Sequence, residues 1–416
     1  MLAVLHAKGR VGTLQMVKGV LGFTYAAPWL ARTDAFPLSP RLPLQEALWE
    51  GDEVLFFFAN LLPEGPVLDA LTTLHRLPRG NVYRLLEAFG RECAGAFEMV
   101  PEDDAESPMP MTAFRPYPVE ALAEDLARLA DNIPLLAQHA TLRLSLAGAQ
   151  NKIPVCARDS GLWLPEGATP STHILKPSLQ PKRLFPDSVW NEAFCLRLAN
   201  AVGLPAAPCR VLTEPEPVLV VARYDRTIEG DEILRLHQLD LCQLAGVLPS
   251  QKYETDGGPG FKTCFALIDA HSARPGLDRL RLVDWTLFNV VIGNADAHAK
   301  NLAMVYDMDG KLRLAPAYDL LATGYWPALA DKMAMAIGGE RRPAWVQARH
   351  WQRFAESVGL NPAQLRRRAK VLVECAMAHI ETVSAALAMP APIATALGGT
   401  LQRNGQRLVK TMGDAG

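Results

Sequence analysis

The hydrophobic pattern of the chain changes character near residue 226, and this change most constrains the fold. Residues 141–226 read as short strands around one helix, which covers Val189–Val202 and stops at Gly203 and Pro205. Beyond Asp225 the apolar residues recur at the period of an α-helix, with long helical patterns over 263–271, 281–293, 343–358 and 361–388. The chain is therefore predicted to be an α+β protein of two lobes, a β-containing N-terminal lobe and a predominantly α-helical C-terminal lobe.

The first 140 residues add further structure ahead of these lobes. Residues 1–26 alternate short apolar segments with glycine turns, as a meander of strands does, and residues 42–89 carry helical spacing. The acidic, proline-rich stretch 101–118 disfavours regular structure. These patterns predict four parts, namely 1–105 (a small β unit plus helices), 106–140 (linker and helix), 141–226 (the strand-rich part of the N-terminal lobe) and 227–416 (the helical C-terminal lobe).

Composition identifies an ordinary globular protein and removes several functional classes. Of the 416 residues 49% are hydrophobic and 21% are charged, and the formal net charge of −2 excludes a globally basic nucleic-acid-binding protein. The seven cysteines are odd in number and widely spread, which argues against a disulfide framework. No run of about 18 apolar residues is present, and histidine and cysteine lack zinc-binding spacing. We therefore expect a cytoplasmic protein without a membrane segment or a transition-metal site.

Two short segments in the second half of the chain carry the spacing of a phosphoryl-transfer site. Asp296 and Asn301 are five residues apart, and Asp319 follows on a later segment. Transfer of a phosphoryl group from ATP needs one carboxylate near the attacking hydroxyl and oxygen ligands that hold Mg²⁺ on the phosphates. The protein-kinase signature places Asp, Asn and Asp in this order. Because Asn and Asp also close turns and cap helices, the spacing alone favours the two interpretations equally.

Local patterns place these polar residues on loops. The apolar run Trp285–Gly293 precedes the Asp296 segment and predicts a buried helix or strand, so that segment is expected on a loop held by the core. Asp307–Gly310 is a turn of the Asp-Gly hairpin type, and Lys311–Ala315 alternates as a short strand does. Asp319 is therefore expected at the end of a strand.

Residues further upstream supply partners for such a site. Lys176 ends the strand pattern Thr172–Lys176, and Glu192 lies on the following helix, which is the order of the lysine and glutamate that act together in kinases. A lone strand-end lysine is more often solvated, and Glu192 is also explained as an acid near a helix N-terminus. The segment Leu144–Lys152 stands where a phosphate-covering loop belongs. It contains a single glycine and is equally typical of a hairpin turn, although its backbone amides suit phosphate oxygens.

Three further segments each have two interpretations. Val218–Arg226 is a buried strand that runs into a charged turn, and it is either core or a hinge that offers backbone groups to adenine. Lys252–Gly260 is a polar loop with three glycines, which either lines a cleft or only turns a corner. The basic run Arg366–Lys370 is either a solvated helix face or a contact with DNA, and the solvated face is favoured.

Together these blocks resemble the HipA family, the kinase toxins of bacterial type II toxin–antitoxin pairs. The resemblance covers nearly the whole chain. Its carriers are Ser145–Gln150 with Lys152, Thr172–Lys176, Asn191–Glu192, Arg223–Arg226, Lys252–Gly260, Gly293–Asn301 and Leu314–Asp319, joined near the N-terminus by Phe56–Gly65 and Gly90–Ala96. Several blocks in the family's order are far more specific than any one of them.

The resemblance implies an ATP- and Mg²⁺-dependent serine/threonine protein kinase whose two-lobed fold is like that of the phosphatidylinositol kinases. By it, Asp296 is the catalytic base, and Asn301 and Asp319 are the Mg²⁺ ligands. Ser145 is the autophosphorylation site, where a phosphate adds about −1.5 to −2 charges at the place meant for the phosphates of ATP. The ATP-binding residues are then Ala147, Gly148, Ala149, Gln150, Lys152, Lys176, Glu192, Arg223, Tyr224, His298 and Lys300.

The resemblance also implies partners. These are a small DNA-binding antitoxin of the HipB type, operator DNA reached mainly through that antitoxin, a dimeric state within the complex, and a protein substrate such as glutamate–tRNA ligase. Two other classes stay open, namely a kinase-like scaffold that acts with the antitoxin as a DNA-bound corepressor, and a metal-assisted phosphohydrolase in which Asp296 and Asp319 hold two metals. The intact lysine and acidic residues argue against the scaffold, and the lack of further His and Asp clusters argues against the hydrolase.

Overall fold

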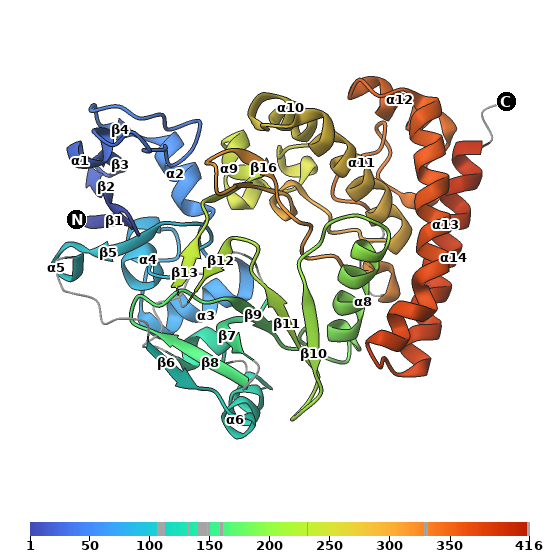
Figure 1. The fold of residues 1–416 in the computed structure, drawn as a ribbon, viewed down its shortest axis with the longest axis horizontal. Helices are drawn as coiled ribbons and strands as arrows, with labels where there is room; N and C mark the ends of the chain where they lie inside the picture. Colours follow the sequence, from blue (N-terminus) through green and yellow to red (C-terminus); the bar gives the residue numbers. More distant parts are fainter. Residues whose placement is uncertain are drawn as a thin grey trace.

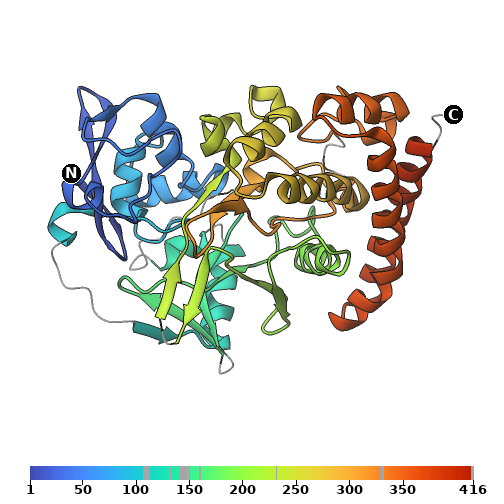
Figure 2. The ribbon, with the colours of Figure 1, turned by 45° about the horizontal axis from the view of Figure 1, so that its top comes forward.

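The computed structural model contains an N-terminal β unit, a six-stranded sheet and a helical C-terminal part (Figures 1 and 2). In Figure 1 the chain runs from the blue N-terminal unit at the left, through the green sheet, to the red helical pair at the right. The predicted α+β class with a helical C-terminal lobe is confirmed. The structure describes residues 1–105, 113–130, 133–139, 148, 150–158, 161–230, 232–327, 329 and 332–413.

The N-terminal unit is a five-stranded antiparallel sheet in the order β4-β3-β2-β1-β5. A two-residue turn at Lys18 and Gly19 joins β2 to β3, and both residues have positive φ (49° and 89°), which matches the twist of a hairpin. The expected meander of strands over residues 1–26 is present, and helices α2 and α4 pack against it. The bounds are β1 Leu2–His6, β2 Gly9–Val17, β3 Val20–Tyr25, α1 Ala27–Leu30, β4 Trp49–Glu50, α2 Asp52–Ala59, α3 Gly65–His75, α4 Val82–Phe89, β5 Glu98–Pro101 and α5 Glu102–Ala105.

The second sheet is antiparallel throughout, in the order β10-β11-β9-β7-β8-β6. Helix α8 packs on β10 and β11, and it is buried over most of its circumference because helix α13 covers its other side. The helix expected over Val189–Val202 is therefore present with nearly the predicted bounds. The bounds are β6 Ala113–Pro116, α6 Val119–Ala130, α7 Leu135–Gln138, β7 Ile153–Arg158, β8 Gly161–Glu166, β9 His173–Lys176, α8 Ser188–Ala201, β10 Cys209–Leu212 and β11 Val218–Ala222.

The segment 106–140, expected to be a linker and a helix, also contributes a strand to this sheet. Strand β6 pairs with β8 from Ala113 opposite Glu166 to Pro116 opposite Trp163. It is an edge strand, which is where a proline is tolerated because one side of the strand has no ladder to complete. The proline-rich composition therefore marks an edge strand as well as a connection.

The C-terminal part is helical apart from two small sheets, a β12–β13 hairpin and the three strands β14-β15-β16. Helix α14, which runs antiparallel beside α13 in Figure 1, was not predicted, because its glycines lower helix propensity. One of them, Gly405, lies so close to Val373 that an added Cβ would be 2.9 Å from its methyl group. The bounds are β12 Arg226–Glu229, β13 Glu232–Arg235, β14 Gln238–Asp240, α9 Leu241–Ala245, α10 Phe261–His271, α11 Pro275–Ile292, β15 Ala303–Tyr306, β16 Leu312–Leu314, α12 Ala348–Ser357, α13 Pro362–Ala386 and α14 Ala391–Gly413, with 3₁₀ turns at Pro249–Gln251, Glu254–Asp256, Ala299–Asn301, Thr323–Tyr325 and Pro343–Trp345.

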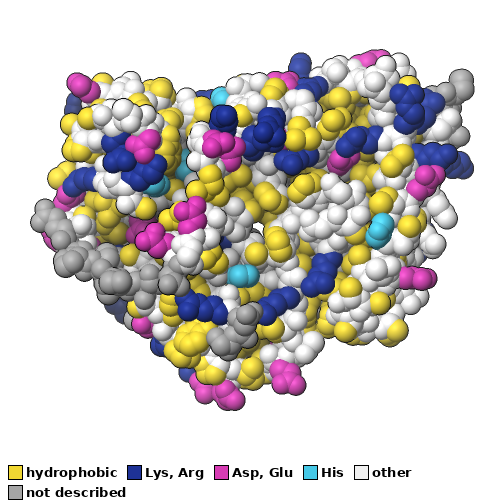
Figure 3. All heavy atoms as spheres, in the orientation of Figure 1, with side chains coloured by type: hydrophobic (Ala, Val, Ile, Leu, Met, Phe, Trp, Pro, Cys, Tyr) yellow, Lys and Arg dark blue, Asp and Glu magenta, His cyan; other side chains and the backbone are white. Residues whose placement is uncertain are grey.

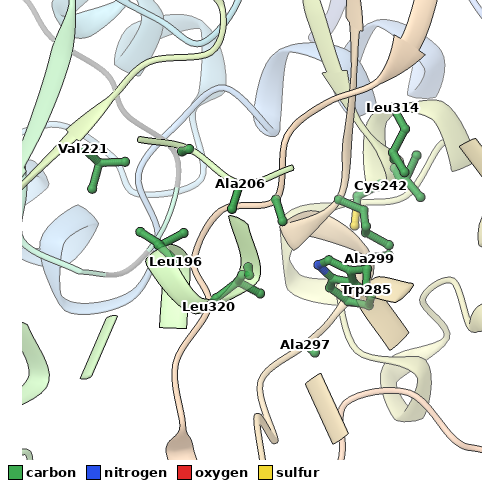
Figure 4. Close-up of a cluster of buried hydrophobic side chains, with 14 of the residues drawn as sticks. Leu196, Ala206, Val221, Cys242, Trp285, Ala297, Ala299, Leu314 and Leu320 are labelled. Carbon is green, nitrogen blue, oxygen red and sulfur yellow. The ribbon is translucent and has the colours of Figure 1, made fainter. Parts of the chain in front are cut away.

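A continuous apolar core joins the sheet to the helical part and supports the polar loops between them (Figure 4). Leu196 of α8 and Val221 of β11 belong to the same cluster as Trp285 of α11. Ala297 and Leu320, which flank the predicted site residues Asp296 and Asp319 in sequence, are buried in it too. Each polar loop is therefore anchored by an adjacent buried apolar residue.

A buried ionic network joins the N-terminal unit to the second sheet. Glu92 lies between three guanidinium groups, 2.8 Å from Arg223, 3.1 Å from Arg226 and 2.7 Å from Arg235. Asp225 pairs with Arg223 at 2.8 Å and accepts a hydrogen bond from the backbone N–H of Gly95 at 2.8 Å. These side chains are at most 7% exposed, so each charge depends on its partners rather than on water.

In contrast to this buried network, the basic side chains on the visible surface are dispersed. On the face shown in Figure 3, Lys and Arg side chains form several separate groups among acidic ones. Within the run Arg366–Lys370 on α13, Arg368 forms an ion pair with Asp284, and Lys370 lies 3.8 Å from Glu374. At least two basic side chains of this run therefore lie beside acidic residues of the protein itself. Of the helices that the structure describes, none has the length and apolar character needed to cross a membrane.

The buried network predicts a large stability cost for Glu92→Gln. Loss of its charge leaves buried arginines short of a partner, so the free energy of unfolding should fall by about 3–5 kcal/mol, measured by chemical denaturation. Burial would raise the pKa of the Glu92 carboxyl, but the three arginines outweigh it and lower the pKa to about 2, from an ordinary 4.5. The ionised form is therefore favoured by folding, so the stabilisation is complete above about pH 4.5 and is lost as the pH falls toward 2.

The matched control is Glu87→Gln, which removes an exposed ion pair with Arg84 on α4. An exposed pair of this kind contributes roughly 0.2–1 kcal/mol. Equal losses of unfolding free energy in the two variants would contradict a stabilising role of the Glu92 charge. So would a difference in unfolding free energy between the wild type and Glu92→Gln that stays constant below about pH 4.5.

Candidate active site

A cavity of about 790 Å³ lies between the second sheet and the helical part. This volume is within the range of small-molecule sites, roughly 300–1,000 Å³. Walls come from β9, β11, α8, the loop after α11 and the loop after β16, and from the N-terminal unit through Asn60, Leu61 and Glu64. Of the residues predicted from sequence, the cavity brings together Gly148, Gln150, Lys152, Lys176, Glu192, Arg223, Tyr224, Asp296, His298, Lys300, Asn301 and Asp319.

The loop that carries Asp296 is built by the end of helix α11. Gly293 ends the helix with φ 71°, a left-handed conformation that glycine adopts readily. Side-chain amides then fix the loop, because Asn294 Oδ1 accepts from the Asp296 N–H at 3.0 Å and Asn301 Nδ2 donates to the Asp296 carbonyl at 2.9 Å. The run Trp285–Gly293 is thus a helix, and the expected loop held by the core is present. The amide oxygen of Asn301 is left as an acceptor.

Asp296 itself is 54% exposed. Its Oδ1 accepts a hydrogen bond from the hydroxyl of Tyr253 at 2.7 Å, and His298 Nε2 lies 4.0 Å away. The pKa of the Asp296 carboxyl is raised, chiefly because the cavity walls displace water from it, while the Tyr253 hydrogen bond opposes this and Asp319 adds to it. The arrangement is that of a carboxylate that can take a proton from a group placed beside it.

Asp319 lies in the same cavity but not at a strand end. Strand β16 stops at Leu314, and Asp319 follows in a loop with φ 56°, in the left-handed region that Asp tolerates better than most residues. Its Oδ1 accepts from Lys176 Nζ at 2.8 Å. Shielding from water would raise the pKa of this carboxyl, but the charge of Lys176 outweighs it and lowers the pKa to about 2. Asp319 is therefore ionised at neutral pH.

Lys176 also meets Glu192, as the sequence order predicts. Its Nζ lies 2.6 Å from Glu192 Oε1, and the two side chains are 10% and 2% exposed. Glu192 is the fifth residue of α8 and points to this lysine, so the alternative of an acid held at the helix N-terminus does not describe it. Burial would lower the pKa of Lys176, but Asp319 and Glu192 reverse this and raise it, so the lysine keeps its charge.

The predicted phosphate-covering segment is described only in part. Ser145, Ala147 and Ala149 lie outside the described residues. Gly148 has φ 110°, and a Cβ added there would lie 2.8 Å from Lys152 Nζ, so a side chain at this position would displace that lysine. Burial and the neighbouring Lys176 lower the pKa of Lys152 to about 8. Two lysines thus share one region of the cavity, an arrangement suited to a ligand of several negative charges.

At the predicted hinge the two residues have different surroundings. The guanidinium of Arg223 belongs to the buried ionic network described above, so it holds the fold together. Tyr224 stacks on Tyr318 with ring centroids 5.5 Å apart, and its hydroxyl donates to Gln238. Apolar side chains complete this end of the cavity, namely Ile174, Val221, Ala222 and Leu321.

Lys300 and His298, both predicted to bind ATP, are also placed by the structure. Lys300 Nζ donates to Asn60 O at 2.9 Å, to Asn60 Oδ1 at 2.8 Å and to Asp240 Oδ2 at 2.6 Å, which uses the three protons of an ammonium group. Lys300 therefore ties the N-terminal unit to the helical part. Burial, with Lys252 next, lowers the pKa of His298 to about 3, so this ring is neutral, and it lies edge-on to Tyr253.

Sequence reasoning missed the share of the N-terminal unit in the cavity. Asn60 and Glu64 line it, and Glu64 Oε2 accepts from Lys252 Nζ at 2.9 Å. The signal was available, because both the Phe56–Gly65 block and the Lys252–Gly260 loop stand out in the sequence. What the sequence could not show is that these blocks, nearly two hundred residues apart, meet.

The chain has a sheet-based lobe and a helical lobe, and the cavity between them holds a lysine–glutamate pair and two acidic loops. These features define a protein of the two-lobed kinase class. Comparisons with known proteins agree. A model of the HipA N-terminal domain matches residues 2–100, and a model of the HipA-like C-terminal domain matches residues 144–380. The chain belongs to the HipA family, and it is a serine/threonine-protein kinase by this membership.

Individual relatives cover most of the chain. "Putative kinase Y4mE" of Sinorhizobium fredii is 42% identical over 364 residues, 86% of this chain and 85% of that protein. The serine/threonine-protein kinase toxin HipA of Shewanella oneidensis is 32% identical over 352 residues, 81% of this chain and 78% of that protein. A solved structure of Shewanella oneidensis MR-1 HipA with HipB and its operator DNA matches with a TM-score of 0.85 at 27% identity, covering 99% of this chain and 98% of that one.

The contacts of Lys300 predict a structural role that a substitution can reveal. Lys300→Met removes the donor to the oxygen atoms of Asp240 and Asn60, which are shielded from water. The free energy of unfolding should therefore fall by about 3–5 kcal/mol. The measurement is chemical denaturation of the full chain. Lys370→Met, at an ion pair whose lysine is 66% exposed, is the matched control and should change it by less than about 1 kcal/mol. A Lys300→Met protein as stable as the control would refute this role.

Proposed function

We propose that this protein is the kinase toxin of a type II toxin–antitoxin pair, and that it transfers the γ-phosphoryl group of ATP to a serine or threonine of another protein. One observation carries the proposal. Lys176 lies within hydrogen-bond distance of both Glu192 and Asp319, at 2.6 and 2.8 Å, so three residues of the kinase pattern meet although 143 positions separate Lys176 from Asp319. Chance spacing of common turn residues does not predict that meeting.

The proposed roles follow from the chemistry of each group. Asp296 acts as the base for the acceptor hydroxyl, because its carboxylate is the exposed one. Lys176 and Lys152 hold the phosphates, with the backbone around Gly148 and Gln150. Tyr224 and the apolar wall beside it receive the adenine ring, with backbone groups at Arg223 and Tyr224 as the hinge. Glu192 positions Lys176.

The residues present fit Mg²⁺ and ATP. The Asp319 carboxylate is ionised and the Asn301 amide oxygen is left as an acceptor, and hard cations such as Mg²⁺ take oxygen donors of this kind. Bound there, Mg²⁺ would neutralise charge on the phosphates. The described part of the chain holds no group of three or more His, Cys, Asp or Glu side chains suited to a metal, so a two-metal phosphohydrolase has less support than a kinase.

Partners and location belong to the same proposal. The Shewanella oneidensis relative was solved with HipB and operator DNA. By analogy this chain would bind a HipB-like antitoxin in the cytoplasm, reach operator DNA mainly through it, and be dimeric in that complex. The proposed substrate is a translation-related protein, with glutamate–tRNA ligase favoured by the family resemblance. The proposed domain boundaries are those predicted from the sequence, 1–105, 106–140, 141–226 and 227–416. The second candidate is a weakly catalytic corepressor scaffold.

Asp296→Asn tests the kinase against the scaffold. It should lower transfer of labelled phosphate from ATP in the presence of Mg²⁺ by about 10²–10⁴-fold, the contribution of a general base, while ATP affinity and the melting temperature stay close to wild type. Phosphoproteomics of cells that express either form should then identify the substrate as the protein that loses phosphate in the variant.

The matched control is Asp309→Asn, at an exposed position of the hairpin turn after β15, which should transfer phosphate at the wild-type rate. Undiminished transfer by Asp296→Asn would exclude the proposed mechanism. Release of free phosphate without any labelled protein would favour a hydrolase, and no turnover in the wild type would favour the scaffold.

Ser145→Ala tests the proposed off-switch. If Ser145 is the autophosphorylation site, prolonged incubation with ATP and Mg²⁺ should silence the wild type, because the added charge of about −1.5 to −2 repels the phosphates of ATP from Lys152 and Lys176. The alanine variant should keep its initial rate, and peptide mass spectrometry should find phosphate on Ser145 of the wild type alone. Equal loss of activity in both proteins would overturn this role.

A further inference from the structure

The glycine-rich segment Lys252–Gly260 is a rigid turn beside Asp296. At Gly258 an added Cβ would lie 1.9 Å from the carbonyl oxygen of Gln251, so only glycine fits. The backbone N–H of Gly258 donates to Tyr253 O at 2.9 Å, and Glu254 accepts from the backbone N–H of Ala336 at 2.6 Å. The segment is thus held by a bond within itself and by one to Ala336, and its first two residues, Lys252 and Tyr253, line the cavity.

Tyr253 holds one oxygen of Asp296 and leaves the other available. Its hydroxyl donates to Oδ1 at 2.7 Å, and its ring is kept in place edge-on to His298, with centroids 5.2 Å apart. His298 Nε2 is 4.0 Å from the same oxygen, too far for a hydrogen bond. Among the described residues no donor reaches Oδ2, and the side chain is 54% exposed. The carboxylate is therefore anchored at one oxygen and open at the other.

Lys252 links this arrangement to the N-terminal unit. Its Nζ lies 2.9 Å from Glu64 Oε2, and the two side chains are 16% and 14% exposed, which is far more shielded than a surface pair. The backbone N–H of Glu64 donates to Gly148 O at 3.1 Å. Glu64 thus contacts the phosphate-covering segment through its backbone and the glycine-rich segment through its side chain.

We propose that Tyr253 is a positioning residue that aims Oδ2 of Asp296 at the acceptor hydroxyl of the protein substrate, and that the Glu64–Lys252 ion pair holds Tyr253 in that place from the N-terminal unit. The proposal rests on the proposed function, since it needs Asp296 to act on a hydroxyl. In the transfer step the acceptor O–H bond breaks and its proton goes to Oδ2. The acceptor oxygen bonds to the γ-phosphorus as the bond to ADP breaks, and Tyr253 keeps its own proton.

A fixed base matters because phosphoryl transfer depends on near-attack geometry, and a misplacement of about 1 Å costs about 10²-fold in rate. A carboxylate on a loop with one free torsion at Cα–Cβ would otherwise sample several rotamers. The Tyr253 hydroxyl removes that freedom. A hydroxyl this close to the base has the alternative role of a phosphoryl acceptor, which would leave phosphate on Tyr253.

Tyr253→Phe tests the proposal in the full chain. The change keeps the ring against His298 and removes only the hydroxyl. We expect kcat for transfer from labelled ATP to dephosphorylated casein and to the protein itself to fall about 10- to 100-fold, the scale of one hydrogen bond to a charged group. The KM for ATP should stay within about two-fold, since the lost interaction serves the transition state rather than nucleotide binding.

The matched control is Tyr325→Phe. Tyr325 also donates its hydroxyl to a carboxylate, Asp187 Oδ2 at 2.9 Å, but it does not line the cavity, so kcat should be unchanged. Glu64→Gln should lower kcat by a smaller factor, and it should have no further effect in the Tyr253→Phe background, because the two residues act in series. Additive effects of the two substitutions would overturn the link to the N-terminal unit.

The outcomes separate this inference from the proposed function. If Asp296→Asn is inactive while Tyr253→Phe keeps the wild-type kcat, the positioning role is refuted and the kinase assignment stands. If Asp296→Asn is fully active, the proposed function itself fails. Phosphate found on Tyr253 by mass spectrometry would make this residue an acceptor, and the positioning role would then be wrong. A loss of kcat at constant KM for ATP and unchanged melting temperature, with no phosphate on Tyr253, supports it.

Discussion

The ammonium group of Lys176 is the interaction on which the rest of the site depends. It lies between Glu192, carried by helix α8 of the N-terminal lobe, and Asp319, carried by a loop of the C-terminal lobe. Two carboxylates shielded from water repel each other, and one cation between them turns that repulsion into attraction. The two acids in turn favour the charged lysine, because burial alone would lower its pKa and their charges reverse that effect. One buried charge therefore links the two lobes across the cavity.

The N-terminal unit forms part of the wall of the candidate active site, through Asn60, Leu61 and Glu64. Several polar links join it to the kinase lobes, among them the network around Glu92 and the contacts of Lys300 with Asn60. Buried ionic groups are costly unless every member is paired, so such links tolerate little relative motion. Through Glu64 and Lys252 the unit also contacts a loop of the helical lobe.

The sequence predicts the parts of this site that local order determines. A strand-end lysine followed by a helix with an acid in its second turn gives the Lys176–Glu192 contact, because only 16 positions separate the two residues in the chain. Long-range partners are not visible in this way. Lys300 was predicted only as an ATP-binding residue, and the sequence gives no sign of its contact with Asn60, which lies 240 residues earlier in the chain. Asp319 was expected at a strand end, since no local signal separates a left-handed loop residue from the residue that closes a strand.

Charge balance within the cavity gives a physical reason for the mixture of lysines and acids. Cationic and acidic side chains line it in nearly equal number, and Lys176, Lys252 and Lys300 each lie within 2.9 Å of a carboxylate. The charges of these lysines are thus balanced by carboxylates of the protein, and this pairing offsets the cost of burying them. A ligand with several negative charges then needs added positive charge, and the oxygen donors of Asn301 and Asp319 fit a divalent cation that supplies it. More lysines would have attracted the same ligand, but each would have needed its own buried acid.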